Sequence, residues 1–355
     1  MLSPSAFRDL ASGRRRGLAA SLSRCLMRTL EVPYTAAVRL RNWRYDTGRS
    51  QIHRVDVPVV SVGNITLGGT GKTPTVEWIV RWFSDQNVRV GILSRGYGAQ
   101  DGRPNDEALE LAEKLPGVPH VQDPDRVRGA RRAIEEFGCQ LLVLDDGFQH
   151  RRLARDFDLV LVDALEPFGL EHVVPRGTLR EPLAGWSRAS ALMLTRTELA
   201  DDDERSAIRR RAARLAPQAI WLEATHCPQA LRSPGGAEQP LESLAGQRIL
   251  TFCGIGNPAG FRHSLAGCHY DIVASREFAD HMAYTPESVH ELARWSDGQE
   301  AAAVVCTHKD LVKVGPTWSG TKPLLALSGR LQIVVGQAVL EAQLEPLVRR
   351  ALERR

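Results

Sequence analysis

The sequence offers little support for a disulfide-bonded or zinc-binding protein. Its six cysteines stand at positions 25, 139, 227, 253, 268 and 306, and no two of them form a Cys-x-x-Cys pair. Closely spaced cysteines are typical of small secreted scaffolds and of structural zinc sites. The scattered pattern argues against both, and a reducing cytosol is the simplest setting for this chain.

The sequence also lacks an apolar run long enough to span a bilayer, a repeat and a low-complexity tract. What is present, 43% hydrophobic and 25% charged residues over 355 positions, is the composition of a soluble globular protein large enough for two domains. Prolines and glycines gather at 226–247. We interpret this stretch as the connection between a domain at 49–225 and a second domain at 248–355.

Residues 1–48 form a basic, amphipathic segment. Residues 1–54 contain eleven arginines and three acidic residues, which gives this part a charge of +8 in a chain whose net charge is +4. Leu18, Leu22, Leu26 and Leu30 share one face of a predicted helix. Such a segment suits an anionic surface, either nucleic acid or membrane headgroups, but its leucines could equally pack on the protein's own core.

A glycine-rich loop joins an apolar strand at 57–62 to a helix predicted over 74–83. The loop and the residues that follow it read Thr66-Leu67-Gly68-Gly69-Thr70-Gly71-Lys72-Thr73. Glycines let backbone N–H groups converge on phosphate oxygens at a helix N-terminus. The lysine then reaches the outer phosphates and the threonine hydroxyl can ligate Mg²⁺, so the pattern predicts a nucleoside triphosphate site.

This loop departs from the strict phosphate-loop pattern at one position, because Thr66 stands where the first glycine belongs. The alternative is a glycine-rich turn that carries an exposed lysine. The order of strand, loop, Gly-Lys-Thr and helix favours phosphate binding.

Strands and helices alternate after this loop, as a parallel sheet flanked by helices requires. We expect strands at 88–93, 141–144, 159–162, 191–194, 249–253, 271–273, 301–306 and 324–327, and an arginine-rich helix at 125–137. The expected fold class is α/β, with a parallel sheet domain of the P-loop NTPase type, a second and smaller α/β domain, and an N-terminal amphipathic helix.

Two aspartates follow the predicted strand at 141–144. Asp145 and Asp146 are placed like the acidic residue that holds Mg²⁺ in nucleoside triphosphatases. The structural alternative is a simple turn formed by Asp146-Gly147.

Other polar residues are ambiguous when each is taken alone. Asp106 could be a helix N-cap, the pair Asp280-His281 could be a surface arrangement, and Arg180 with Glu181 lies in a loop. The lysine of the run 307–310 is one place too late for the guanine-reading signature of many GTPases, which favours ATP over GTP.

Taken in order, these motifs resemble those of the tetraacyldisaccharide 4′-kinase family, the lipid A 4′-kinases. The resemblance extends over residues 30–330 and rests on the segments 61–74, 94–98, 106–107, 125–126, 145–150, 179–182, 254–258, 278–281 and 307–310. It implies transfer of the γ-phosphoryl group of ATP to the 4′-hydroxyl of a tetraacylated glucosamine disaccharide 1-phosphate, giving lipid IVA, in an organism with an outer membrane.

The resemblance also implies roles for individual residues. The loop from Thr66 to Thr73 would bind the nucleotide together with Arg180, and Lys72 would also be catalytic. Asp106 and His281 would form a catalytic pair that accepts the hydroxyl proton, one residue from each domain. The Mg²⁺ ligands would be Thr73, Asp145, Asp146 and Glu181, and the substrate contacts would be Arg126 and Gln149.

The basic segment gains a rationale from this resemblance, since a lipid substrate would lie at the cytoplasmic face of the inner membrane. We expect peripheral membrane association, with no nucleic acid and no obligate protein partner. Two rival functions share the phosphate loop: a soluble P-loop kinase or ligase that acts on a small metabolite, and a nucleotide-switched assembly protein.

Overall fold

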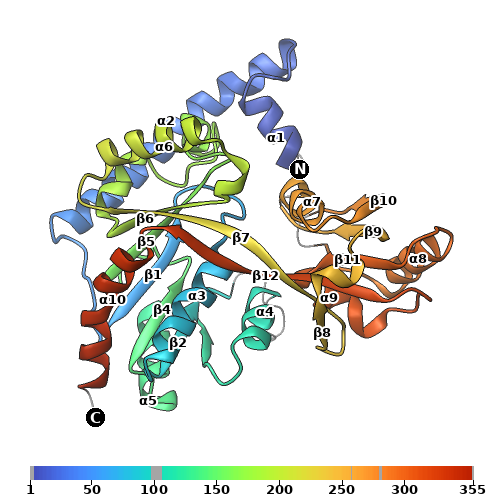
Figure 1. Ribbon diagram of the computed structural model, residues 1–355. Coiled ribbons are helices and arrows are strands. Elements are labelled where there is room, and N and C mark those ends of the chain that lie inside the picture. The colour runs from blue at the N-terminus through green and yellow to red at the C-terminus, as the bar shows by residue number, and fades with distance from the viewer. Residues whose placement is uncertain (1–3, 97–105, 257, 280–281, 354–355) are drawn as a thin grey trace. The chain divides into compact units, whose positions relative to one another are not determined.

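The computed structural model describes residues 4–96, 106–256, 258–279 and 282–353, with the backbone alone at 4–5 and 106–107. Contacts divide the chain into two compact units. Unit 1 comprises residues 1–99, 115–225 and 333–355, and unit 2 comprises 100–114 and 226–332. The chain passes between the units along two long strands, β7 (Ile220–Arg232) and β12 (Leu324–Val335), which are yellow and red in Figure 1.

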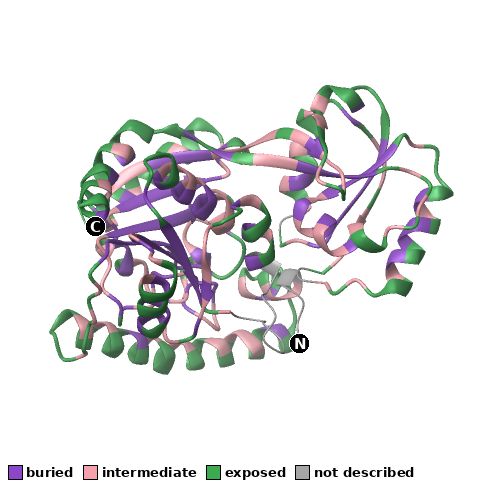
Figure 2. Cartoon of the chain, turned by 90° about the horizontal axis from the view of Figure 1, so that it is seen from below, coloured by how far each residue is buried: buried purple, intermediate pink, exposed green. Residues whose placement is uncertain are grey.

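Unit 1 is built on a parallel sheet with the strand order β7-β6-β5-β1-β4-β2-β3. Its strands besides β7 are β1 (Val59–Asn64), β2 (Val90–Ser94), β3 (His120–Gln122), β4 (Leu141–Asp145), β5 (Phe157–Asp163) and β6 (Ala191–Thr195). Most of these strands are buried along their whole length (Figure 2). Near-continuous apolar runs of this kind form parallel sheets that are covered on both faces.

Six α-helices and three 3₁₀ helices accompany this sheet in the described part of unit 1. They are α1 (Pro4–Ala11), α2 (Leu18–Asp46), α3 (Lys72–Asp85), α5 (Arg126–Phe137), α6 (Asp202–Leu215), α10 (Gln337–Leu352), η1 (Gly169–Glu171), η2 (Leu183–Arg188) and η3 (Thr197–Leu199). Across the described residues, no helix combines the length and the apolar character that crossing a bilayer requires.

The order of the strands creates a topological switch point at the end of β1. This strand lies between β4 and β5, and the chain leaves it through α3 to reach β2 on the far side of β4. Ligands of open α/β sheets bind beyond the carboxyl ends of the strands at such a switch point. Val62 of β1 pairs in register with Asp145 of β4, so the phosphate loop and the aspartates lie at the same edge.

In unit 2 the strands of the same sheet follow the order β10-β9-β11-β12 with parallel pairing, and β8 pairs antiparallel with the end of β7. The remaining elements of this unit are α4 (Asp106–Lys114), β8 (Glu238–Pro240), η4 (Leu241–Leu244), β9 (Arg248–Cys253), α7 (Pro258–Gly267), β10 (Asp271–Glu277), α8 (Pro286–Asp297), β11 (Ala303–Thr307), α9 (His308–Val314) and η5 (Gly315–Thr317). The α/β class and the smaller second unit agree with the prediction.

The division into units differs from the predicted boundaries in three places. Residues 226–247 are not a simple connection, because they contain the end of β7 and the strand β8. The C-terminal helix α10 returns to unit 1, where Leu340 and Leu344 are fully buried. Helix α4 is grouped with unit 2, where Glu113 forms an ion pair with Arg232 at 3.0 Å.

Candidate active site

The phosphate loop occupies residues 65–71 between β1 and α3. Gly68 and Gly71 have φ values of +104° and +86°, in the region that L-residues rarely adopt. Gly71 is the N-cap of α3, and its carbonyl accepts a hydrogen bond from Thr75 Oγ1 at 2.8 Å. The first amides of α3, which begins at Lys72, have no acceptor within the helix and are suited to an anion.

One side of the loop is held by the segment that contains Arg180. Leu67 N donates to Thr178 O at 2.7 Å, and Arg180 N donates to Ile65 O at 2.7 Å. These two bonds form a short antiparallel bridge, so the position of Arg180 beside the loop is fixed by the backbone.

The other side of the loop is held by the residues that end β6. Thr195 Oγ1 donates to the carbonyl of Thr70 at 2.9 Å, and Arg196 donates to the carbonyl of Gly69 at 2.5 Å. Arg196 also pairs with Asp163 at the end of β5. The carbonyls of Gly69 and Thr70 are thus turned to the protein on this side of the loop.

Asp146 lies among cations at the edge of the sheet. Its carboxylate is 2.7 Å from Arg180 Nη1 and 3.9 Å from Lys72 Nζ. Burial raises the pKa of the Asp146 carboxyl, but the charges of Lys72, Arg180 and Arg126 outweigh that effect and hold the pKa below its ordinary value. Asp146 is therefore ionised at neutral pH, and its neighbour Asp145 is the buried last residue of β4.

Arg126 is a buried residue beside the two aspartates. It is the first residue of α5, and its Nη1 donates to Asp123 O at 3.0 Å, while its buried Nε has no partner among the described residues. Burial and the charge of Arg95 lower the pKa of Arg126, and Asp145 and Asp146 oppose that shift. The arginine thus lies within electrostatic reach of Asp145 and Asp146, two of the four predicted metal ligands.

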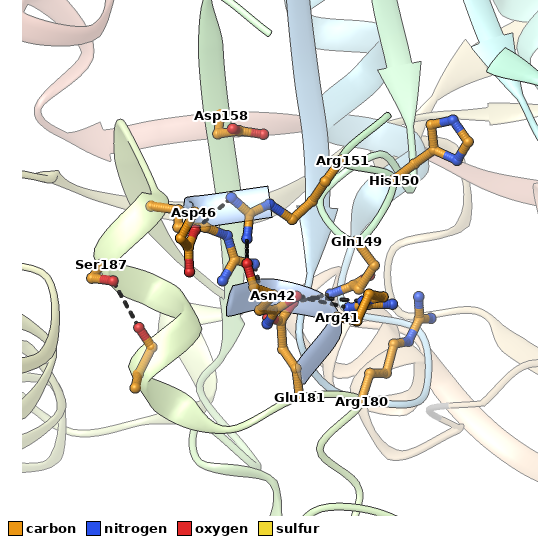
Figure 3. Close-up of polar contacts among 12 residues, drawn as sticks. Arg41, Asn42, Asp46, Gln149, His150, Arg151, Asp158, Arg180, Glu181 and Ser187 are labelled. Carbon is orange, nitrogen blue, oxygen red and sulfur yellow. Dashed lines mark hydrogen bonds and ion pairs between the residues drawn. The ribbon is translucent and has the colours of Figure 1, made fainter. Parts of the chain in front are cut away.

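Glu181 and Gln149 meet in a buried polar cluster (Figure 3). Glu181 is 0% exposed, and its oxygens accept hydrogen bonds from Gln149 Nε2 at 3.0 Å, Asn42 Nδ2 at 3.0 Å and Arg188 Nη2 at 2.8 Å. Gln149 also donates to the carbonyl of Asn64 at 2.8 Å. Both oxygens of the predicted metal ligand Glu181 thus contact protein donors, and Gln149 contacts the end of β1.

The predicted catalytic pair is largely outside the described residues. Asp106 is the first residue of α4, of whose side chain nothing is described, and His281 lies outside the described residues. Contacts group Asp106 with unit 2, not with the first domain as predicted. The predicted pairing of Asp106 with His281 itself stays a prediction.

The remaining residues fit a Mg²⁺ site that is completed by substrate phosphates and water, and not one made of protein ligands alone. Among the described residues, no three His, Cys, Asp or Glu side chains gather as metal ligands. Mg²⁺ in kinases is commonly held by one or two carboxylates together with substrate phosphates and water. Thr73 in the first turn of α3, with Asp145 and Asp146 at the end of β4, supplies such a partial ligand set.

Comparison with known proteins assigns this arrangement to a family. A family model described as tetraacyldisaccharide-1-P 4′-kinase matches residues 23–349. The chain belongs to this family.

Two proteins named tetraacyldisaccharide 4′-kinase illustrate the kinship. The one from Anaeromyxobacter sp. (strain K) is 38% identical over 339 residues, covering 89% of this chain and 88% of the relative. The one from Chlorobaculum parvum is 37% identical over 355 residues, covering 92% and 94%. A crystal structure of LpxK from Aquifex aeolicus, described as an "apo" form in complex with ATP, matches with a TM-score of 0.72 at 27% identity over 92% of this chain and 99% of that one. The predicted family and fold class are confirmed.

The sequence analysis did not predict several residues that lie at this site. His150 follows Gln149, and its buried Nε2 has no partner among the described residues. Burial and the charges of Arg126 and Arg155 lower the pKa of His150 to about 4, so the imidazole is neutral at pH 7. Thr195 and Arg196 carried a usable signal, because they directly follow a buried apolar strand, whereas Asn42 carried none.

Proposed function

We propose that this protein transfers the γ-phosphoryl group of ATP to the 4′-hydroxyl of tetraacyldisaccharide 1-phosphate and so forms lipid IVA. The observation that carries this proposal is the meeting of Lys72, Arg180 and Asp146 at the N-terminus of α3, in a member of the 4′-kinase family. Phosphoryl transfer needs little besides positioning and charge stabilisation, which this edge of the sheet can supply.

The phosphate loop would bind the β- and γ-phosphates through backbone amides at the start of α3 and through Lys72. The 3.9 Å separation of Lys72 Nζ from Asp146 is too long for a strong hydrogen bond, so the ammonium group can turn to a phosphate oxygen at small cost. Arg180, which already lies beside the loop, would offer its guanidinium to the same phosphates.

Thr73, Asp145 and Asp146 would hold Mg²⁺. When bound, the ion neutralises charge on the phosphates as the bond to the leaving group breaks. Both oxygens of Glu181 are bonded to protein donors, so we assign this residue to the support of the site, next to Arg180.

Asp106 and His281 remain the proposed catalytic pair on the strength of their motifs. A sugar hydroxyl is a weak nucleophile, and a carboxylate oriented by an imidazole can accept its proton during transfer. Arg126, a buried cation whose Nε has no partner within the described part of the chain, and Gln149 are the proposed contacts to the disaccharide or its phosphate.

The first part of α2 would bind the cytoplasmic face of the inner membrane. Leu18, Leu22 and Leu26 are 86%, 71% and 60% exposed, so this stripe does not pack on the protein's own core. Arginines border the stripe, and an apolar face with a basic edge is typical of helices that lie in an anionic membrane surface.

The activity is tested with labelled ATP and tetraacyldisaccharide 1-phosphate in detergent micelles. We expect label on the 4′-oxygen of the lipid, and we expect Lys72→Ala to lose about 10²–10³-fold in turnover, as does removal of one preorganised charge-stabilising donor. Phosphate release without lipid labelling would favour the nucleotide-switched assembly protein, and labelling of a soluble metabolite would favour the small-molecule kinase.

Membrane association is tested by flotation with vesicles that contain phosphatidylglycerol. The triple change of Leu18, Leu22 and Leu26 to Ser removes apolar area from the stripe and should move the protein to the soluble fraction. Leu165→Ser is a matched control, since Leu165 is 52% exposed but lies outside the helix. Equal flotation of the wild type, the triple variant and Leu165→Ser would contradict the proposed location.

A further inference from the structure

Helix α2 has a second face, distinct from the leucine stripe, that contacts the active-site loop. Glu31, Val38 and Asn42 recur at helical spacing and turn toward the protein. Glu31 accepts hydrogen bonds from His172 Nδ1 at 3.2 Å, Val173 N at 3.3 Å and Arg176 Nη1 at 3.1 Å. The helix is thereby fastened to the segment that leads to Arg180 and Glu181.

The contacts of α2 continue to those two residues themselves. Tyr34 donates its hydroxyl hydrogen to the carbonyl of Arg180 at 3.2 Å, and Asn42 Nδ2 donates to Glu181 at 3.0 Å. The Asn42 side-chain oxygen accepts from Arg41 at 3.2 Å, and its backbone carbonyl accepts from Arg151 at 3.0 Å, so both the side chain and the backbone of Asn42 are bonded (Figure 3).

Glu181 depends on these donors because it is fully buried. A buried carboxylate is tolerated only when hydrogen bonds replace its hydration. Asn42 is one of three side chains that do so, with Gln149 and Arg188. Through Gln149 the cluster reaches the carbonyl of Asn64 at the end of β1.

Glu181 is also the chain neighbour of Arg180, whose guanidinium pairs with Asp146 at 2.7 Å. The bonds that hold Glu181 thus add to the backbone bridge that places Arg180 beside the loop. The leucine stripe and this contact lie on one continuous helix, Leu18–Asp46.

We propose that Asn42 is a positioning residue for phosphoryl transfer, which holds Glu181 so that Arg180 and Gln149 keep their places at the phosphate edge. This inference rests on the proposed function, because it takes that edge to be the site of reaction. The N-terminal helix then has two tasks on two faces, one toward the lipid surface and one toward the site.

The test compares Asn42→Ala with Asn42→Gln, which keeps the amide donor, and with Arg39→Ala, an exposed control on the same helix. Loss of a residue that supports site ligands typically costs about 10–100-fold in metal affinity or activity. We expect Asn42→Ala to lose kcat within that range and to weaken binding of a non-hydrolysable ATP analogue with Mg²⁺, measured by calorimetry. The KM for the lipid and vesicle flotation should stay at wild-type values, and Asn42→Gln should recover most of the loss.

Wild-type kcat and nucleotide affinity in a folded Asn42→Ala protein would overturn the inference, and so would a parallel loss of vesicle binding. If Asn42→Ala does not fold, Asn42→Asp, which replaces the donor to Glu181 by an acceptor, should lower kcat with unchanged lipid KM, and an unchanged kcat would overturn the inference. A deletion of residues 1–45 would remove both the leucine stripe and Asn42, so it could not separate membrane binding from support of the site. Should the wild-type protein fail to phosphorylate the lipid, the proposed function fails, while the calorimetric comparison still decides the role of Asn42.

Discussion

Two aspartates, each near the end of a parallel strand, have opposite surroundings. Asp146 follows β4 in unit 1 and faces the cations Lys72 and Arg180. Asp310 follows β11 in unit 2 and accepts hydrogen bonds from neutral groups: Gly254 N at 3.1 Å, Tyr284 Oη at 2.9 Å and Thr307 Oγ1 at 2.6 Å. Asp146 is half-buried, whereas Asp310 is 1% exposed.

The difference shows that a place in the topology does not decide what an acidic residue does. Cationic side chains can pair with a phosphate in place of a carboxylate, so the surroundings of Asp146 are suited to nucleotide binding. Fixed neutral donors satisfy Asp310 completely and connect three segments of unit 2. The ring of Tyr284 packs edge-on against Phe252 and Phe278, which strengthens the same junction.

The largest expected effect lies at Asp146. Asp146→Asn removes the charge and keeps the shape, and we expect kcat to fall about 10³-fold, or about 4 kcal/mol of transition-state stabilisation, with little change in melting temperature. Turnover measured beside Asp85→Asn, an exposed control at the end of α3, checks this. Near wild-type turnover in Asp146→Asn would show that Asp146 takes no part in phosphoryl transfer.

The second effect should appear as stability. Asp310→Ala leaves three donors without an acceptor, the buried Gly254 N–H and the partly buried hydroxyls of Tyr284 and Thr307, and we expect the free energy of unfolding to fall by about 3 kcal/mol, while the nucleotide affinity of the folded protein is kept. Denaturant unfolding would measure it, with the exposed Asp297→Ala as control. If Asp310→Ala abolished transfer at unchanged stability, the contrast between the two aspartates would break down.

The smallest effect concerns acid pH and His150, which lies on the charged side of the comparison. Its pKa is about 4 in the folded protein and near 6.5 in an unfolded chain, so between these values the unfolded state binds more protons. Stability therefore falls as pH drops from 6.5 toward 4, by about 1 kcal/mol for this partly exposed group. Melting curves at pH 7 and 5 should show a smaller difference in His150→Gln, and an identical difference would remove His150 from the acid response.

Local chemistry made much of unit 1 predictable. Continuous apolar runs at 141–144 and 191–194 identify buried strands, and β4 and β6 contain them with only small differences at the ends. The loop from Thr66 to Thr73 was predicted because its glycines and lysine have one common use in that order. Asp145 and Asp146 were then placed by topology, since parallel strands end at a common edge.

The boundaries of the units were harder to predict for a physical reason. The chain crosses between the units along β7 and β12, and α10 and α4 join the units that their apolar or charged faces contact. Proline and glycine at 226–247 indicated a break, although β7 continues into this stretch and pairs with β8. Contacts between distant parts of the chain override composition at such places.

By itself, the sequence determined the α/β class, the phosphate loop and the family, because each depends on residue types in a fixed local order. Only the tertiary structure decided that the leucines of α2 are exposed while Asn42 of the same helix supports Glu181. It likewise decided that Asp146 faces cations and Asp310 neutral donors. The partners of a buried charge come from segments far apart along the chain, and no local pattern specifies them.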